Sequence, residues 1–551
     1  MCALKTRRWP ALSTALSKPP DTDDPSVRPP VAIWIGFGAM CVGMFMAILD
    51  VQVVATSLPE IQGALRIAPD EMSWVQTAYL IAEVIAIPLT GCLTRILGMR
   101  WLFVLALLLF TLASAGCAAS GTFPVLVAFR VLQGFSGGPL IPTVFSAVFL
   151  LFPGRRQGVA TTLAGMLAML APTVGPMVGG WITDTMSWHW LFLINVIPGV
   201  ISMALAGALL PGRSARSSGT RRIDILALAL MAIALGALET ALKQAPDRGW
   251  ESGPVIGLLA LSLISLAGFI RRTLGAARPV VDLRAFADRR FTIGCVLSFV
   301  LGVGLFGSVY LMPVFLAYVR LHDALETGQI MLVTGIAQLA AAPIAVALEQ
   351  RVEPRLLTAA GFALFALGLA MSATQTPQTD FAAMIWPQVV RGLAIMFCLL
   401  PPTRLALGHL RASRVPDASG LFNLMRNLGG AIGLALIDTV VYSRAPVHAD
   451  AIVARLRAGD VETARFLGLS LDHFAERAAG PIDAATTALL RPIVERGAMT
   501  MAINDAWGMI ALLTFAALLC VPFARGGVVC ATDDFRRDAA AARTSGDHTI
   551  A

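Results

Sequence analysis

Continuous apolar runs of about 20 residues recur along the whole chain, and each is long enough to cross about 30 Å of hydrocarbon as a helix. Apolar and polar residues do not alternate within the runs, which excludes a transmembrane β-barrel. The chain is therefore expected to be an all-α polytopic membrane protein. We place fourteen spans, near residues 31–56, 73–93, 101–119, 123–149, 159–181, 189–210, 223–242, 254–270, 291–317, 327–348, 355–373, 382–403, 418–441 and 503–524.

The composition agrees with this class and excludes others. Only 14% of the 551 residues are charged, against about 25% in soluble globular proteins. The net charge of +8 does not indicate nucleic-acid binding, because the basic residues lie in short loops where topology rules explain them. The eight cysteines show no paired spacing, and the histidines are scattered. We therefore expect no disulfide framework, no metal site and no enzyme.

The basic residues also predict the orientation. If residue 1 is cytoplasmic, most lysines and arginines fall on inside segments, and the short outside loops carry only Arg66, Lys243, Arg248 and Arg320. Such a bias places both termini in the cytoplasm. A missed span would invert every later loop, so the pattern also favours an even number of spans. The sequence thus predicts a multi-pass membrane protein with both termini on the cytoplasmic side.

The loop lengths suggest a division of the chain. Residues 1–30 have no apolar core with a cleavage site and are expected to be a disordered cytoplasmic tail. Residues 31–210 would form a six-helix bundle, 211–290 two inserted helices with their loops, 291–524 a second six-helix bundle, and 525–551 a second tail. The connection 443–502 is long and polar, and we expect two short helices in it, near 451–467 and 483–499. Arg130 in span four and Arg391 in span twelve are followed by similar residues, which suggests a repeat of the halves.

Charged residues inside spans are the functional candidates, because a charge at bilayer depth is costly unless it faces protein or water. At about 1.5 Å per helical residue, Asp50 and Arg130 fall at similar depth, where they could pair, and Glu83 falls near the midplane. Burial raises the pKa of a carboxyl group and a nearby arginine lowers it, so a carboxyl group that alternates between these surroundings can load and release a proton. We predict that Asp50 titrates, that Arg130 tunes it, and that Glu83 binds a cationic substrate or a second proton. A fixed structural bridge between Asp50 and Arg130 is the alternative.

Three motifs carry a family resemblance over about residues 33–523. They are the stretch 49–61 in span one, Arg130-Val131-Leu132-Gln133-Gly134 in span four, and Gly175-Pro176-Met177-Val178-Gly179-Gly180 in span five. On these the chain resembles the major facilitator superfamily, and within it the EmrB/QacA branch of fourteen-span drug:proton antiporters. The resemblance implies two six-helix bundles plus two inserted helices.

Two departures from the family pattern stand out. The loop from Gly91 to Arg100 is similar to the superfamily's gating loop, but Arg95 stands where many members have aspartate. In span one, Gln52 replaces the family's threonine, and we place it with Glu83 among the substrate-binding candidates. The residues assigned to gating or packing are Gly91, Gly98, Arg100, Gln133, Gly134, Gly175, Pro176, Gly179, Gly180, Arg391 and Arg426.

The function expected from the resemblance is proton-coupled export of drugs or other amphipathic toxic compounds across the inner membrane. No nucleotide-binding motif occurs in the sequence, so the expected energy source is the proton gradient, with no cofactor. Relatives in this branch work with a periplasmic adaptor and an outer-membrane channel, and the loop 443–502 is a candidate docking site for the adaptor. Export of one dedicated metabolite or lipid-like compound is the alternative function.

Overall fold

The computed structural model describes residues 29–66, 72, 74–152, 155–212, 224–276, 279–349, 351–469 and 484–523. Within them, fourteen helices are long and apolar enough to cross a membrane. Each coincides with one of the fourteen predicted spans, so the predicted fold class is confirmed. The two predicted tails lie outside the described residues, apart from residues 29 and 30.

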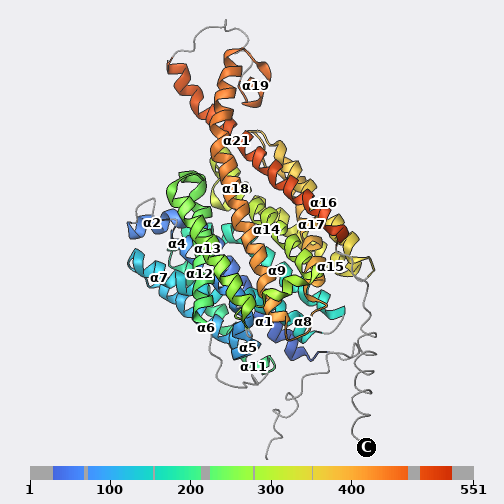
Figure 1. The fold of residues 1–551 in the computed structure, drawn as a ribbon. Coiled ribbons are helices and arrows are strands. Elements are labelled where there is room, and N and C mark those ends of the chain that lie inside the picture. The colour runs from blue at the N-terminus through green and yellow to red at the C-terminus, as the bar shows by residue number, and fades with distance from the viewer. Residues whose placement is uncertain are drawn as a thin grey trace, which may run out of the picture.

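The helical segments from α1 to α11 build spans one to six (Figure 1). Proline or glycine lies at several points where a span bends, as at η1 and between α7 and α8. The segments are α1 (Val31–Thr56), α2 (Leu58–Leu65), α4 (Trp74–Ala86), η1 (Ile87–Leu89), α5 (Thr90–Leu97), α6 (Met99–Ala118), α7 (Phe123–Gly137), α8 (Leu140–Leu151), α9 (Arg155–Thr185), α10 (Trp190–Leu193) and α11 (Val196–Leu209), and α12 (Ile225–Arg248) then opens the inserted pair.

The remaining segments complete the inserted pair and build the last six spans. Asp288 and Asp380 begin two of these spans, since each side chain accepts hydrogen bonds from backbone N–H groups of the first turn. The segments are α13 (Gly253–Gly275), η2 (Leu283–Ala287), α14 (Arg289–Phe315), η3 (Leu316–Arg320), α15 (Ala324–Glu349), α16 (Pro354–Met371), η4 (Ser372–Thr374), α17 (Phe381–Leu407), α18 (Val415–Arg457), α19 (Val461–Phe466), α21 (Ala484–Ala516) and η5 (Ala517–Phe523).

The packing of the helices defines two six-helix bundles and an inserted pair. In the first bundle α1 packs on α9 and α11, and α4 and α6 pack on α7. In the second, α14 packs on α18, and α17 packs on α15 and α16. The inserted helices α12 and α13 pack on each other, and α12 also contacts α4 of the first bundle and α18 of the second. The inserted pair therefore joins both bundles.

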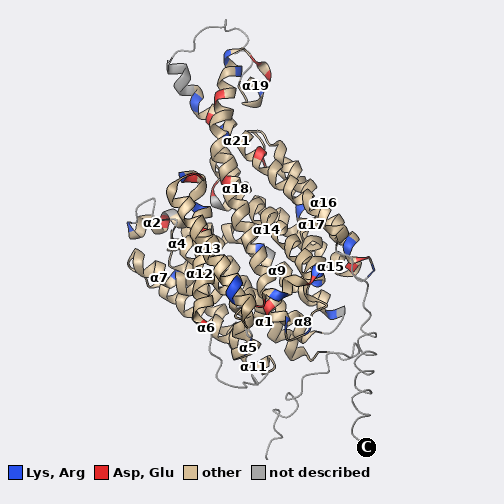
Figure 2. Cartoon of the chain, in the orientation of Figure 1, with Lys and Arg blue, Asp and Glu red and all other residues tan. Residues whose placement is uncertain are grey.

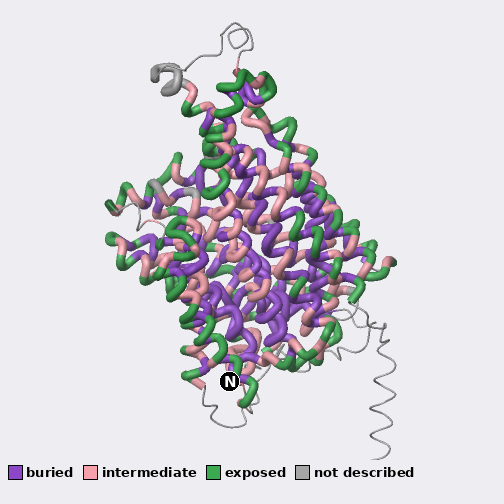
Figure 3. Tube along the Cα trace, turned by 45° about the horizontal axis from the view of Figure 1, so that its top comes forward, coloured by how far each residue is buried: buried purple, intermediate pink, exposed green. Residues whose placement is uncertain are grey.

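The surface of the helical body is suited to lipid. Buried residues fill the centre and exposed residues cover the periphery (Figure 3), and charged residues are sparse along the spans (Figure 2). Many exposed side chains within spans are large and apolar, among them Ile197, Ile264, Trp386 and Leu512. Such a continuous apolar periphery is costly in water and favourable in hydrocarbon.

The connection 443–502 differs from its prediction. Instead of separate short helices, α18 continues without a break to Arg457, and α21 begins at Ala484 and runs into the last span. No glycine interrupts the chain between Gly433 and Gly459, and Gly459 then ends the helix with a positive φ of 78°. In the described part of this connection, only α19 is a separate short helix. The predicted break at residues 480–481 lies outside the described residues.

The two extended helices project from one end of the helical body (Figure 1). We call the part that the structure describes, residues 443–469 and 484–502, the extension. Ile452, Leu456, Leu467, Val494 and Ala498 form a small apolar core within it. We call the end of the body that carries the extension the extension side, and the opposite end, where α1 begins and α21 ends, the tail side.

Candidate functional site

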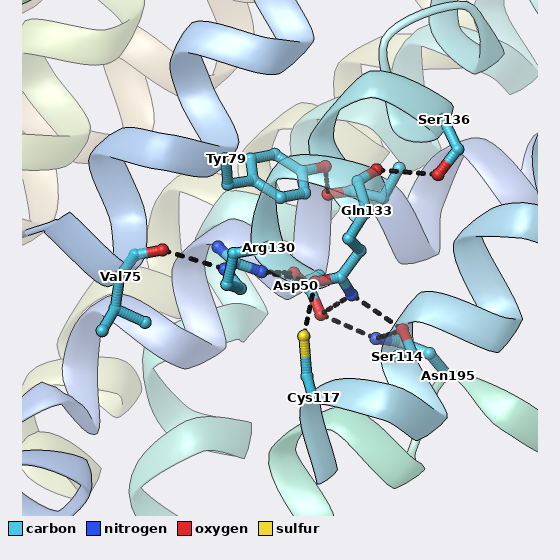
Figure 4. A network of polar contacts seen from close by, with 10 residues as sticks. Asp50, Val75, Tyr79, Ser114, Cys117, Arg130, Gln133, Ser136 and Asn195 are labelled. Atoms are coloured by element: carbon cyan, nitrogen blue, oxygen red, sulfur yellow. Dashed lines mark hydrogen bonds and ion pairs between the residues drawn. The ribbon is translucent and has the colours of Figure 1, made fainter. Parts of the chain in front are cut away.

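Asp50 lies in the last third of α1, and its carboxylate is the centre of a buried polar network (Figure 4). The Arg130 Nη1 atom of α7 donates to Asp50 Oδ2 at 2.5 Å. Asp50 is 1% exposed and Arg130 is fully buried. The depth estimate thus placed the two side chains correctly beside one another. Their role in coupling stays a prediction.

Gln133 follows Arg130 by one helical turn on α7 and therefore faces the same neighbours. Its Oε1 accepts from Arg130 Nη1 at 2.7 Å, and its Nε2 donates to Asp50 Oδ1 at 2.9 Å. The same Nε2 also donates to Ser114 Oγ of α6 at 2.7 Å. Gln133, assigned from sequence to gating or packing, is thus a direct ligand of both charged groups.

Asn195 completes the network from the segment between α10 and α11. Its Nδ2 donates to Asp50 Oδ1 at 2.7 Å and to Ser114 Oγ at 3.3 Å. The sequence analysis assigned no role to Asn195 or Ser114. A single amide or hydroxyl in an apolar run gives little signal, and only packing shows that both reach Asp50.

In its hydrogen bonds with Arg130, Gln133 and Asn195, the Asp50 carboxylate is always the acceptor. An ionised carboxylate accepts only, so this arrangement fits the charged form. The guanidinium also donates to the Val75 carbonyl and stacks 4.3 Å above the centre of the Tyr79 ring. Its Nη2 atom is buried without a hydrogen-bond partner. The network therefore surrounds one buried carboxylate with three hydrogen-bond donors.

Gly134 brings α7 against α4 and so positions Arg130. A Cβ atom at residue 134 would lie 2.2 Å from the Tyr79 carbonyl oxygen, so only glycine fits. Tyr79 itself donates to the Ala47 carbonyl of α1 at 3.2 Å. Helices α1, α4 and α7 are therefore in close contact at this level.

Glu83 lies on α4 and is 7% exposed. Among the described residues, its carboxylate takes part in no recorded hydrogen bond or ion pair. Glu239 of the inserted helix α12 is near enough to interact with it electrostatically. Glu239 lies well inside its helix, because α12 continues to Arg248, about 13 Å farther along.

Lys243 lies one turn beyond Glu239 and donates to the Thr77 hydroxyl of α4. The inserted helix therefore contributes both a carboxylate and an ammonium group beside α4. Asp224 begins α12 by accepting from Ala227 N, and its ion pair with Arg272 of α13 lowers its pKa.

The glycine-rich face of α9 lies between the two bundles. Gly175 packs against Gln52 of α1, since a Cβ there would approach the Gln52 Cβ to 2.4 Å. Gly165, two and a half turns away, packs against Leu399 of α17 in the same way. Pro176 lies within the helix, and the Gly179 and Gly180 carbonyls both accept from the Thr183 hydroxyl. These residues have the close packing that their composition suggested.

Gly91 and Arg95 of α5 contact the first turn of α18 on the tail side. Arg95 forms an ion pair with Asp417, and a Cβ at Gly91 would lie 2.6 Å from the Asp417 Cα. Nearby, Ser419 donates to the Pro142 carbonyl of α8 at 2.8 Å. The two bundles are therefore in direct contact on this side, and Asp417, which sequence reasoning missed, is central to that contact.

Gly98 and Arg100 have local roles at the same end. Gly98 joins α5 to α6 with a φ of 79°, a conformation that favours glycine. Arg100 donates to the Leu210 carbonyl at the end of α11, at 3.2 Å. Both positions fit the packing role that the gating-loop motif suggested.

Arg391 and Arg426 are buried in the second bundle without carboxylate partners among the described residues. The Arg426 guanidinium lies over the rings of Phe145 and Phe422, 5.7 and 5.5 Å from their centres. Because Phe145 belongs to α8, Arg426 contributes to the contact between bundles. Arg391 is instead directed to a small internal cavity, described below.

The comparisons with known proteins agree with this architecture. The family model of the Major Facilitator Superfamily matches residues 40–434. The chain belongs to the major facilitator superfamily. It is 35% identical over 505 residues to the Colistin resistance protein EmrB of Acinetobacter baumannii, an alignment that covers 90% of this chain and 98% of that protein.

Two further relatives place the chain within the superfamily. The Multidrug export protein EmrB of Escherichia coli (strain K12) is 33% identical over 412 residues, which cover 74% of this chain and 80% of that protein. The Fatty acid resistance protein FarB of Neisseria gonorrhoeae is 31% identical over 427 residues, 77% of this chain and 84% of that protein. The chain is therefore an EmrB-type efflux transporter and not an enzyme, as the sequence predicted. It is a multi-pass protein of the inner membrane.

Among solved structures, the human organic anion transporter MFSD10 has a similar fold. The TM-score is 0.58, with 13% sequence identity and coverage of 89% of this chain and all of that one. At this identity the likeness concerns the fold alone.

Proposed function

We propose that the protein exports small amphipathic compounds in exchange for protons by alternating access. The supporting observation is the Asp50 network, which holds a carboxylate, an arginine and two amides away from solvent in the first bundle. A buried ion pair of this kind often stabilises a fold less than apolar packing would. A functional reason for keeping it is therefore favoured over a purely structural one.

Protonation of Asp50 would remove the negative charge that Arg130, Gln133 and Asn195 now contact. The freed guanidinium would then keep only Val75 O and Gln133 as hydrogen-bond partners. Because the network joins α1, α6, α7 and the segment before α11, its loss would alter how four elements of the first bundle pack. This is how proton binding would bias the position of one bundle relative to the other.

The tail-side contact is the proposed gate of the transport cycle. Gly91, Arg95 and Asp417 hold α5 against α18, and Gly420 approaches the Ile87 carbonyl. On the extension side α4 and α18 are joined mainly through α12. Separating the tail-side contact would open the interior to that face, and re-forming it would close the interior again.

The proposed exchange is tested in proteoliposomes with an acidic lumen that contains a pH-sensitive dye. Ethidium and anilinonaphthalenesulfonate, an amphipathic cation and an amphipathic anion, are added outside in turn. For at least one of them we expect uptake with a rise in lumenal pH, absent from protein-free liposomes. Uptake that continues unchanged after the pH gradient and membrane potential are collapsed would contradict proton coupling.

We also propose that the tail side faces the cytoplasm and that the extension faces the periplasm and docks an adaptor. Support comes from the charge bias of the loops and from the two helices that continue α18 and α21 beyond the apolar body (Figure 1). Such a rigid, helical projection offers a defined surface, since it has its own apolar core.

Replacing residues 451–496 with a short Gly-Ser linker tests the adaptor proposal. Export from whole cells, measured as resistance to a toxic substrate, should fall to the level of the empty strain. Transport by the purified variant in proteoliposomes should stay within about twofold of wild type, because the altered segment lies outside the helical body. Full resistance in cells would argue against docking at this segment.

A further inference from the structure

A small cavity lies where α9 of the first bundle meets α14, α15 and α17 of the second. Its volume is about 20 Å³, enough for about one water molecule. Pro172 and Thr173 form its wall on the α9 side, and Arg391 lies on the α17 side. The cavity is therefore at the boundary along which the two bundles would move.

Three buried side chains around this cavity carry unused hydrogen-bond donors. Arg391 Nε and Nη1, Gln338 Nε2 and Gln388 Nε2 are all buried without a hydrogen-bond partner. These residues are no more than 3% exposed. Leaving such groups unpaired is unfavourable, and more so for a charged group. Because every unused atom here is a donor, the cavity is complementary to an acceptor.

The charge of the cavity has one sign. Arg391 forms no ion pair among the described residues, and no ionised neighbour acts on it. Its only recorded charge-related contact is with the Trp507 ring, whose centre is 5.0 Å from the guanidinium carbon. Arg130 differs, since Asp50 neutralises it at 2.5 Å. Arg391 is thus a buried cation without a counter-ion among the residues that the structure describes.

The rest of the cavity wall is apolar and adaptable. Leu305, Met312, Met331 and Ile395 line it together with the Thr334 and Ser308 side chains. Methionine side chains are flexible and polarizable, so they can fit ligands of different shape. An apolar wall beside a fork of N–H donors suits a molecule with an apolar body and an anionic end.

We infer that Arg391, Gln338 and Gln388 form a subsite for the anionic end of an amphipathic substrate. A carboxylate, sulfonate or sulfate can accept two parallel N–H bonds from one guanidinium, which no neutral group does as strongly. The inference rests on the proposed transport function, because the cavity must enlarge as the bundles separate before a whole substrate fits. It assigns Arg391 to binding, in place of the packing role suggested by the sequence.

Equilibrium binding without any ion gradient tests the subsite. The probes are decanoate, decanamide and decyltrimethylammonium, which share one chain and differ in charge. Their binding to the purified protein in lipid nanodiscs is measured by equilibrium dialysis, with protein-free nanodiscs subtracted. We expect decanoate to bind at least about 10-fold more tightly than decanamide, since hydrogen bonds to charged groups are the stronger ones.

Arg391→Gln should bring decanoate affinity down to that of decanamide, and Arg391→Lys should keep part of the difference. Gln388→Glu offers Arg391 an internal carboxylate and should weaken decanoate binding as well, so the test does not depend on one variant folding. Arg320→Gln is the matched control, because Arg320 pairs with Asp380 outside the cavity. Its affinity for decanoate should not change. Gel filtration and thermal melting identify any variant that fails to fold.

Equal decanoate affinity in wild type, Arg391→Gln and Gln388→Glu would overturn the inference, as would a preference of the wild type for decyltrimethylammonium. The proposed function can be rejected independently of the subsite. Binding of decanoate that depends on Arg391, with no proton movement in proteoliposomes, would keep the subsite and reject coupling. Proton-coupled transport of ethidium without Arg391-dependent anion binding would keep the coupling and reject the subsite.

Discussion

Replacing Asp50 with asparagine is expected to reduce pH-driven transport to the level of protein-free liposomes. Asparagine has nearly the same shape, so Gln133 and Asn195 can keep part of their contacts, but no group that titrates remains. The change also leaves Arg130 buried without its counter-ion. Breaking a buried pair in this way costs about 3–5 kcal/mol of stability, and we expect a lower melting temperature. Lumenal pH and substrate uptake are measured together in proteoliposomes.

The double variant Asp50→Asn/Arg130→Gln separates coupling from structure. Removing both charges relieves the unpaired arginine, so the melting temperature should recover relative to Asp50→Asn alone. Transport should stay absent, because the proton carrier is still missing. Ser114→Ala is a useful control, since it removes a hydroxyl of the same network but no charge. If the double variant regained pH-driven transport, the alternative of a fixed structural bridge would be correct.

A valine at Gly91 is expected to stop transport by holding the tail-side contact open. The new Cβ would lie 2.0 Å from Asp417 Oδ1 and 2.6 Å from the Asp417 Cα. The backbone atom cannot move away without shifting α18, so shortening Asp417 to alanine should not rescue the variant. Substrate uptake should fall to the level of protein-free liposomes. Binding of decanoate should persist, since the cavity residues are unchanged.

Cysteine labelling locates the effect of Gly91→Val. A Ser308→Cys reporter in the cavity wall, in a background without other cysteines, should react faster with a membrane-impermeant maleimide supplied from the tail side. Gly38→Val in α1 is the matched control, because nothing lies within 4 Å of a Cβ at that position. It should leave both labelling and uptake within about twofold of wild type, because substitutions where the side chain has free space usually have small effects. Unchanged transport by Gly91→Val would show that the contact is not part of the cycle.

How much of the site the sequence could predict depended on the kind of signal each residue gives. Asp50, Glu83 and Arg130 stand out because a charge in an apolar run is rare and costly. Pairing of Asp50 with Arg130 followed from helix rise alone. Asn195 and Ser114 gave no such signal, since polar uncharged residues are common in spans. Asp417 lies near a span end, where charges are unremarkable, and only its contact with Gly91 and Arg95 makes it notable.

The extension shows a limit of a different kind. Polar composition predicted that residues 443–502 leave the membrane, but it could not tell separate helices from continuations of α18 and α21. The stretch between Gly433 and Gly459 has no glycine, and α18 continues through Pro446. Span seven was likewise predicted to end near residue 242, whereas α12 continues to Arg248. An apolar run ends where the chain leaves the lipid, whereas backbone hydrogen bonds can continue the helix beyond that point.

The sequence by itself determined the class of the protein, the number of spans and the acidic and basic groups within them. It could do so because lipid imposes one local rule, that every spanning stretch must be apolar and helical. Only the tertiary structure decided which groups meet: the amides around Asp50, the contact of Asp417 with Arg95, and the donors beside Arg391 that lack a partner. These contacts join residues from helices far apart in the chain. The requirement that a span be apolar and helical acts on each span separately, so it carries no information about such contacts.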